Sequence, residues 1–115
     1  MSYDYLLLRV REPARSLNDL TQEMVSAKDW YDEGREILRS TFPEFHWTED
    51  AMRTHGDGNH LGTVRLDVVL VRAEITHVFV HGSFHADQRE FVRRVSAALG
   101  TTAFDVQTAQ ALAGG

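Results

Sequence analysis

Cysteine is missing from the sequence, which excludes disulfide bonds and thiolate metal sites and fits a reducing cytoplasm. Also missing is an apolar run long enough to cross a bilayer. The first ten residues lack the basic start, longer apolar stretch and small-residue cleavage site of a secretory signal. Without an internal repeat, a low-complexity tract or a linker, the chain is expected to form one globular domain over residues 1–115, with a frayed tail at 112–115.

Basic residues are scarce: 12 Lys and Arg stand against 17 Asp and Glu, a formal net charge of −5. This balance argues against non-specific binding to nucleic acid or to an anionic membrane, and it favours a basic partner. The excess lies in residues 12–50, which hold ten acids and four bases, whereas six acids balance six bases from residue 51 onward. The acidity therefore belongs to one region of the chain.

Motifs that would announce an enzyme are absent too. The sequence has no Walker-type phosphate loop, dinucleotide fingerprint, nucleophile elbow or HExxH zinc motif. Catalytic groups that only the fold brings together cannot be found in one sequence. His85 and Asp105 are conceivable partners of this kind, and nothing selects them over His46 or Asp67. We therefore assign no catalytic residue and expect a protein that is not an enzyme.

The stretch "ITHVFVHGSFH" (75–85) places His77, His81 and His85 at intervals of four, a spacing that suits a metal site on a helix. Its Ile, Thr, Val and Phe content and the interruption at Gly82 favour a strand. Residues four apart in a strand are separated by about 13 Å, whereas zinc ligands lie about 2 Å from one ion. These histidines are therefore not expected to share a metal.

The segment "HGDGNH" (55–60) is the one compact cluster of possible metal ligands, with His55, Asp57 and His60. A loop can bend such groups around a cation. The plainer interpretation is a solvent-exposed hairpin turn, in which the glycines supply positive φ angles. We expect no cofactor, and a small metal- or ligand-dependent enzyme at this loop remains the alternative.

Periodicity and turn signals divide the chain into strands and helices. Strands are predicted at 3–10, 46–55, 63–72, 75–85 and 101–112, and helices at 16–25, 26–40 and 87–99. The order β-α-α-β-β-β-α-β predicts an α+β fold: a single-layer, mainly antiparallel sheet with the helices packed on one face. The first strand is apolar on both faces, which favours a central position in the sheet.

The predicted helix 26–40 is strongly two-sided. Its apolar side, which should meet the sheet, carries Trp30, Tyr31, Gly34, Ile37 and Leu38. The opposite side carries four carboxylates, here called the acidic stripe: Asp29, Asp32, Glu33 and Glu36. The stripe is either a solvated face whose early acids suit the helix dipole, or a docking surface for a basic partner.

The predicted arrangement leaves one side of the sheet without helices, here called the open face. Strand alternation places five side chains there: Val69, Val71, His77, Phe79 and His81. This set is more apolar than a freely solvated sheet requires. Exposed mixed patches of this kind often mark interaction surfaces.

The two ends of the chain resemble a group of short bacterial cytosolic proteins. The resemblance rests on "MSYDYLLL" (1–8) and on "RRVSAALGTTAFDVQTAQAL" (93–112), a helix that leads into a strand and a D-P-Q-T-G-like turn. Val106 stands in place of the proline of that turn, and Ala109 in place of its glycine. Some members of this group are similar to immunity proteins of contact-dependent growth inhibition and related toxin systems.

This resemblance implies a small, acidic, cytoplasmic and non-enzymatic protein that binds the toxic C-terminal domain of a delivery protein, often a basic nuclease. We expect neutralisation by occlusion of the toxin's active site, with no direct contact to nucleic acid or membrane. A non-catalytic subunit of another complex is a further alternative. The candidate partner-binding residues combine the acidic stripe, its neighbours and the open face: Asp29, Asp32, Glu33, Glu36, Glu49, Asp50, Phe79 and His81.

Overall fold

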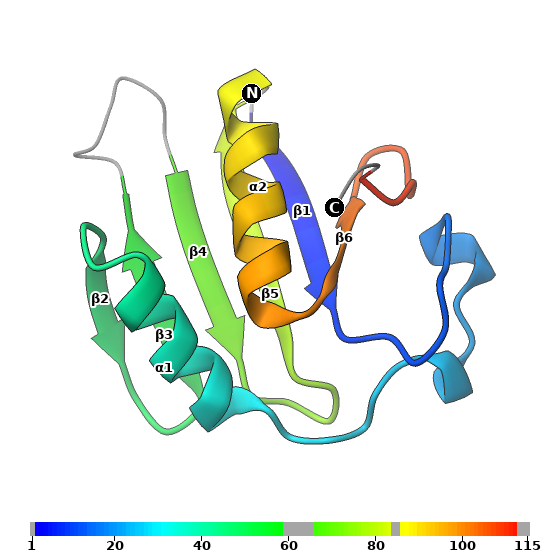
Figure 1. The fold of residues 1–115 in the computed structure, drawn as a ribbon, viewed down its shortest axis with the longest axis horizontal. Coiled ribbons are helices and arrows are strands. Elements are labelled where there is room, and N and C mark those ends of the chain that lie inside the picture. The colour runs from blue at the N-terminus through cyan, green and yellow to red at the C-terminus, as the bar shows by residue number, and fades with distance from the viewer. Residues whose placement is uncertain (1, 59–65, 84–85, 113–115) are drawn as a thin grey trace.

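The computed structural model describes residues 2–58, 66–83 and 86–112, and within them six strands and two α-helices (Figure 1). The strands are β1 (Ser2–Leu8), β2 (His46–Glu49), β3 (Arg53–Asp57), β4 (Leu66–Val71), β5 (His77–Ser83) and β6 (Thr102–Asp105). The helices are α1 (Tyr31–Thr41) and α2 (Ala86–Leu99), and two short 3-10 turns lie at Leu17–Asp19 and Gln22–Met24.

The strands form one antiparallel sheet in the order β2-β3-β4-β5-β1-β6. Both helices lie on the same side of this sheet (Figure 1). The predicted α+β class, with helices on one face, is therefore confirmed. β1 lies between β5 and β6, so its prediction as an interior strand is also confirmed.

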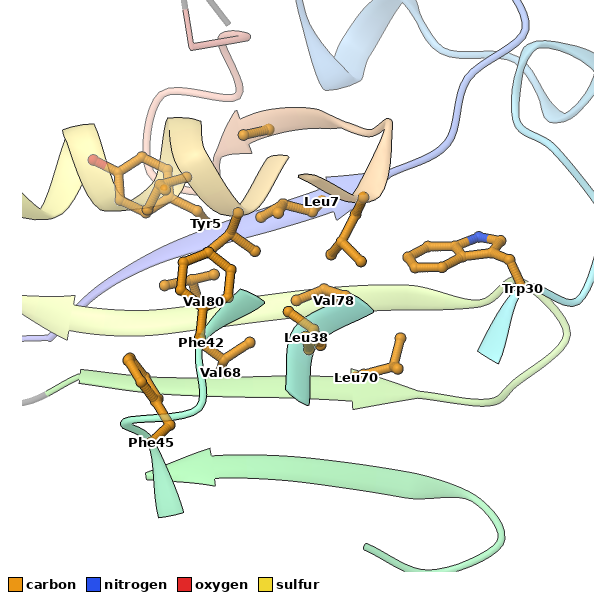
Figure 2. Close-up of a cluster of buried hydrophobic side chains, with 14 of the residues drawn as sticks. Tyr5, Leu7, Trp30, Leu38, Phe42, Phe45, Val68, Leu70, Val78 and Val80 are labelled. Atoms are coloured by element: carbon orange, nitrogen blue, oxygen red, sulfur yellow. The ribbon is translucent and has the colours of Figure 1, made fainter. Parts of the chain in front are cut away.

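The hydrophobic core lies between the sheet and the two helices (Figure 2). Alternate residues of the central strands point into it, as the period of two predicts: Tyr5, Leu7, Val68, Leu70, Val78 and Val80. The helical side of the core carries Trp30, Tyr31, Leu38, Phe42, Val92, Val95 and Leu99. Each fully buried Leu or Val contributes roughly 1.5–3 kcal/mol relative to exposure, so this layer is the main source of stability.

An aromatic cluster closes the core near the start of β2. The Phe45 ring stacks between Trp47 and Phe91, at centroid distances of 5.7 and 5.3 Å. Trp47 Nε1 donates a hydrogen bond to the Phe42 carbonyl at 2.8 Å. Gly56 lies directly under the Trp47 ring, where a Cβ atom would clash. This glycine therefore makes room for an indole, and the prediction that it supplies a turn is wrong.

The helix predicted at 16–25 is replaced by the two 3-10 turns. Ser16 does cap the first turn, since its hydroxyl accepts a hydrogen bond from the Asn18 amide at 3.2 Å. The segment then pairs with distant backbone instead of continuing as a helix. The Leu17 amide donates to the Ala109 carbonyl at 2.7 Å. None of the residues within these turns is buried, so no apolar face drives a longer helix there.

The helix predicted at 26–40 begins five residues later than expected. Ser26 and Asp29 lie before it, and the Ser26 amide donates to the Arg9 carbonyl at 2.9 Å. Asp29 is thus not part of the helix. Its Oδ1 accepts the amide hydrogen of Tyr31, the first helical residue, at 3.0 Å. The apolar side of α1 is as predicted, with Tyr31, Gly34 and Leu38 buried.

The single strand predicted at 46–55 is a hairpin of two strands, β2 and β3. Asp50 makes the turn, because its Oδ1 accepts hydrogen bonds from the amides of Met52 and Arg53 at 2.8 and 2.9 Å. The Tyr31 hydroxyl donates to the Asp50 carbonyl at 2.9 Å and ties the turn to α1. The sequence order therefore misses one strand and contains one helix too many.

The C-terminal part keeps its predicted helix, strand and turn. Gly100 ends α2 with a φ of 64°, as expected of a C-cap. Ala109, which stands where the resembling turns have glycine, has a φ of 63°. Leu112 donates its amide hydrogen to the Ala103 carbonyl at 2.8 Å and packs against the core, so the predicted fraying at 112 is wrong. Residues 113–115 lie outside the described residues.

Candidate binding surface

The two predicted docking surfaces lie on opposite sides of the sheet. The acidic stripe belongs to α1 and the segment before it, on the side that the helices cover. Phe79 and His81 lie on the open face, opposite the core residues Val78 and Val80 of the same strand. One flat partner surface cannot cover both, so the candidate residues form two separate sites.

The stripe carboxylate Glu33 is held by Arg9. The closest pair of atoms, Arg9 Nη2 and Glu33 Oε1, are 3.0 Å apart. Arg9 also donates from Nε to the Leu99 carbonyl at 2.9 Å, and its guanidinium lies 4.6 Å from the centre of the Trp30 ring. The hydrogen bond from Arg9 keeps the pKa of Glu33 below its ordinary value.

Asp29 and Asp32 share one arginine. Arg72 Nη2 lies 3.0 Å from Asp32 Oδ2, and its Nε lies 3.2 Å from Asp29 Oδ2 in an ion pair without hydrogen-bond geometry. The Arg72 guanidinium covers the Tyr31 ring at 4.5 Å. Asp32 also pairs with Arg35 at 3.4 Å. These pairs fasten the start of α1 to the end of β4.

The remaining acidic candidates differ in their partners. Glu49 pairs with Arg39 of α1 at 2.8 Å, and Asp50 is the turn residue of the β2–β3 hairpin. Glu36 has no ion pair among the described residues. The stripe faces solvent as predicted, but internal arginines already neutralise most of it.

The open face is built from rows of side chains that run across neighbouring strands. One row is polar, because the strand register aligns four charged or titratable residues from β3 to β1: Asp57, Asp67, His81 and Asp4. The next row is mostly apolar: His55, Val69, Phe79 and Leu6. The five residues predicted for the open face lie on this side of the sheet and are half-buried: Val69, Val71, His77, Phe79 and His81.

Two histidine–carboxylate pairs lie in these rows. His81 Nδ1 donates to Asp4 Oδ1 at 2.9 Å, between side chains that are each 37% exposed. His55 Nε2 donates to Asp67 Oδ1 at 3.1 Å. Asp67 is only 6% exposed, so His55 covers a carboxylate that the sheet otherwise buries. Such a group requires hydrogen bonds to remain ionised.

A shallow hollow of about 400 Å³ lies between the two pairs. Its walls are Arg53, His55, Asp67, Val69 and His81. A smaller hollow of about 150 Å³ adjoins it at Arg53 and His55 and reaches the β2–β3 turn. The larger one lies within the range of sizes that proteins use to hold a ligand or a partner's side chain. The open face is therefore indented, polar along one row and apolar along the next.

Sequence reasoning found His81 and Phe79 but missed Asp4, Arg53 and the pairing of His55 with Asp67. Asp67 lies two positions before Val69 in the predicted strand 63–72, so the alternation that places Val69 on the helix-free side places Asp67 there as well. His55 ends the predicted strand 46–55 and also begins the segment interpreted as a turn, so the sequence did not indicate that it would lie in a strand beside Val69 and Asp67. His60 lies outside the described residues.

No group of three or more His, Asp or Glu side chains within residues 2–58, 66–83 and 86–112 is arranged to hold a metal ion. Within the same ranges, no helix has both the length and the apolar character needed to cross a membrane.

No family model, curated protein or solved structure matches the chain. The resemblance to immunity proteins at the two ends of the sequence accordingly stays a prediction, and what the surface can bind follows from its own residues.

Proposed function

We propose that this protein binds the C-terminal domain of a bacterial toxin in the cytoplasm and neutralises it, as immunity proteins do. The partner is expected to be basic, and a basic nuclease domain fits the resemblance best. Inhibition follows from covering the toxin's active site or substrate path, without chemistry by this chain. The observation that carries the proposal is the open face, an indented surface of mixed apolar and acidic character without a helix over it.

The composition of the open face supports a protein partner. Val69, Val71 and Phe79 supply half-exposed apolar area next to ionic groups, the mixture found in protein interfaces. The net charge of −5 favours the approach of a basic partner. Complementary charge raises association rates, which benefits a cell that must inactivate a toxin quickly.

The acidic stripe is the weaker candidate surface because of its arginine pairs. A basic partner that bound Asp29, Asp32 or Glu33 would compete with Arg72 and Arg9 for the same carboxylates. That competition reduces the gain from each new ion pair. On the open face, Asp4 pairs with His81 and Asp67 pairs with His55, and an imidazole at neutral charge leaves the negative charge of its carboxylate in place.

The experiment is a binding and protection assay with the toxic domain encoded next to this gene. Wild-type protein is expected to bind the domain and to rescue cells that express it. Phe79→Ala is expected to weaken binding about tenfold or more, as loss of an aromatic anchor does. Glu36→Gln, on the opposite side of the sheet, is the matched control and should change affinity less than twofold. Equal loss in both variants, or loss only in Glu36→Gln, would move the site to α1.

A small ligand-dependent enzyme is a second candidate, favoured by one observation. The His55–Asp67 pair and His81, whose partner is Asp4, line one hollow, and carboxylate partners can orient imidazoles for proton transfer. The site then differs from the predicted loop, since it uses His55 with Asp67 instead of Asp57. Metal analysis of the purified protein and of His55→Ala tests the metal-dependent form of this candidate, because stoichiometric metal that is lost in the variant would favour an enzyme.

A further inference from the structure

The two histidine–carboxylate pairs of the open face can each take up a proton without coming apart. A carboxylate only accepts hydrogen bonds, so the hydrogen is on Nδ1 of His81 and on Nε2 of His55. Neither imidazole has another hydrogen bond within the described residues, so the second ring nitrogen of each is available. A proton bound there turns a singly negative pair into a neutral one.

His81 lies between two carboxylates of the polar row, so a change in its charge changes the net charge of that row. Asp4 on β1 and Asp67 on β4 are its direct neighbours across the sheet. Phe79 stacks against it from the same strand, with the ring planes 10° apart and the centroids separated by 5.8 Å. Two carboxylates therefore face this imidazole, and no cationic group among the described residues adjoins it in the register.

The surroundings of His55 are mixed. Across the sheet it faces Thr48 on β2 and Val69 on β4, with the carboxylate of Asp67 reaching it along the diagonal. Arg53 and Asp57 flank it on the same side of its own strand, one cationic and one anionic. The two flanking charges offset one another, so Asp67 sets the local balance.

The open face as a whole changes sign when its histidines become charged. On its strands, within the described residues, the carboxylates Asp4, Asp57 and Asp67 outnumber the single guanidinium of Arg53. The same side carries four histidines, more than enough to offset that excess: His46, His55, His77 and His81. Histidine is the side chain that ordinarily gains its charge between pH 8 and pH 5.

We infer that the open face is a proton-operated docking surface, which holds a basic partner when its histidines are neutral and releases it when they are charged. The inference rests on the proposed function and adds a regulation to it. The acidic stripe cannot behave in this way, because its partners are arginines that stay charged at all relevant pH values. The His–carboxylate pairs thus distinguish the two sides of the molecule.

The test uses an octalysine peptide as a basic probe, with its binding to the 15N-labelled full chain followed by NMR at low salt. At pH 7.5 the peptide is expected to shift amide signals of the polar row, and at pH 5.5 its affinity should fall about tenfold. The variant His55→Asn, His81→Asn keeps a hydrogen-bond donor at each site but cannot take up a proton. In it the fall should shrink to less than threefold.

The control variant of this experiment changes a residue on the other side of the sheet. Glu36→Gln should keep the full tenfold fall. Asp4→Asn, at a half-exposed position, serves if the double variant does not fold, and it should weaken binding at pH 7.5 while leaving pH 5.5 unchanged. The inference is overturned if wild type binds equally at both pH values, if the double variant keeps the whole fall, or if the peptide shifts signals of α1 instead.

Failure of the inference is distinguishable from failure of the proposed function. If the peptide behaves as expected but the neighbouring toxic domain does not bind at pH 7.5, the immunity function is wrong and the proton-operated surface stands. If the domain binds with equal affinity at pH 7.5 and pH 5.5, and so does the peptide, the function stands and the proton dependence is wrong.

Discussion

The helical side and the open face of this sheet both pair carboxylates with nitrogen-bearing side chains, but the two sides use different residue types. Both place carboxylates next to aromatic rings, but on the helical side the cations are arginines, whereas on the open face the partners are histidines. Arg9 and Arg72 lie over Trp30 and Tyr31 and hold the acids of α1. Permanent cations make structural ties. Titratable partners leave a surface whose charge depends on its surroundings.

The largest expected difference between the two faces concerns their apolar side chains. Val68 and Val69 are neighbours on β4, but Val68 is buried in the core and Val69 is half-buried on the open face. Val68→Ala should lower the free energy of unfolding by about 2 kcal/mol or more, because it removes two methyl groups and leaves a cavity. Val69→Ala should cost less than about 1 kcal/mol. Urea denaturation measures both, and equal costs would show that the open face is covered in solution.

The two faces should also differ in their arginines. Arg72→Ala uncovers the Tyr31 ring and removes the cation that pairs with Asp29, so we expect the free energy of unfolding to fall by about 1–2 kcal/mol. Arg53→Ala, on the open face, removes a side chain with no ion pair among the described residues and should stay within about 0.5 kcal/mol. Thermal unfolding of both variants provides the comparison. A larger loss of stability in Arg53→Ala would mean that Arg53, and not Arg72, is the arginine that stabilises the fold.

The smallest effect is the pH dependence of the Arg9–Glu33 pair. Because Arg9 lowers the pKa of Glu33 in the folded state, the pair stabilises the fold above the ordinary pKa of a glutamate. This contribution disappears as the pH falls through the lowered value. Glu33→Gln should therefore be less stable than wild type at pH 7 and indistinguishable from it at strongly acidic pH. Glu36→Gln is the control, and a similar pH dependence in it would assign the effect to the helix dipole instead of to Arg9.

The parts of the fold that were predicted correctly are those whose pattern is repeated several times. β1, β4, β5 and α2 each present enough apolar residues at the right period to fix their type. The segments that were predicted wrongly are short. Residues 16–25 carry helix signals but no buried face, so distant backbone partners replace the helix. Residues 46–57 form a hairpin that was not predicted, because Gly56, which lies under the Trp47 ring, was interpreted as a turn glycine.

The candidate site, like the fold, was predicted only in part. His81 and Phe79 were predicted for the open face because strand alternation assigns a side to every residue once the strand is known. The pairing of His81 with Asp4 joins residues 77 positions apart, and that of His55 with Asp67 joins residues 12 apart. The arginine partners of the acidic stripe were missed for the same reason, since Arg9 and Arg72 lie outside α1.

The amino-acid sequence by itself determined the two-sidedness of this protein, because the alternation of apolar and polar residues assigns every strand position to the core or to the opposite side. Only the tertiary structure decided which ions neutralise one another. Pairing depends on strand order and register, and these arise from contacts between segments that are far apart in the chain. Asp32 and Glu33 of α1 thereby received arginines, whereas Asp4 and Asp67 of the sheet received histidines.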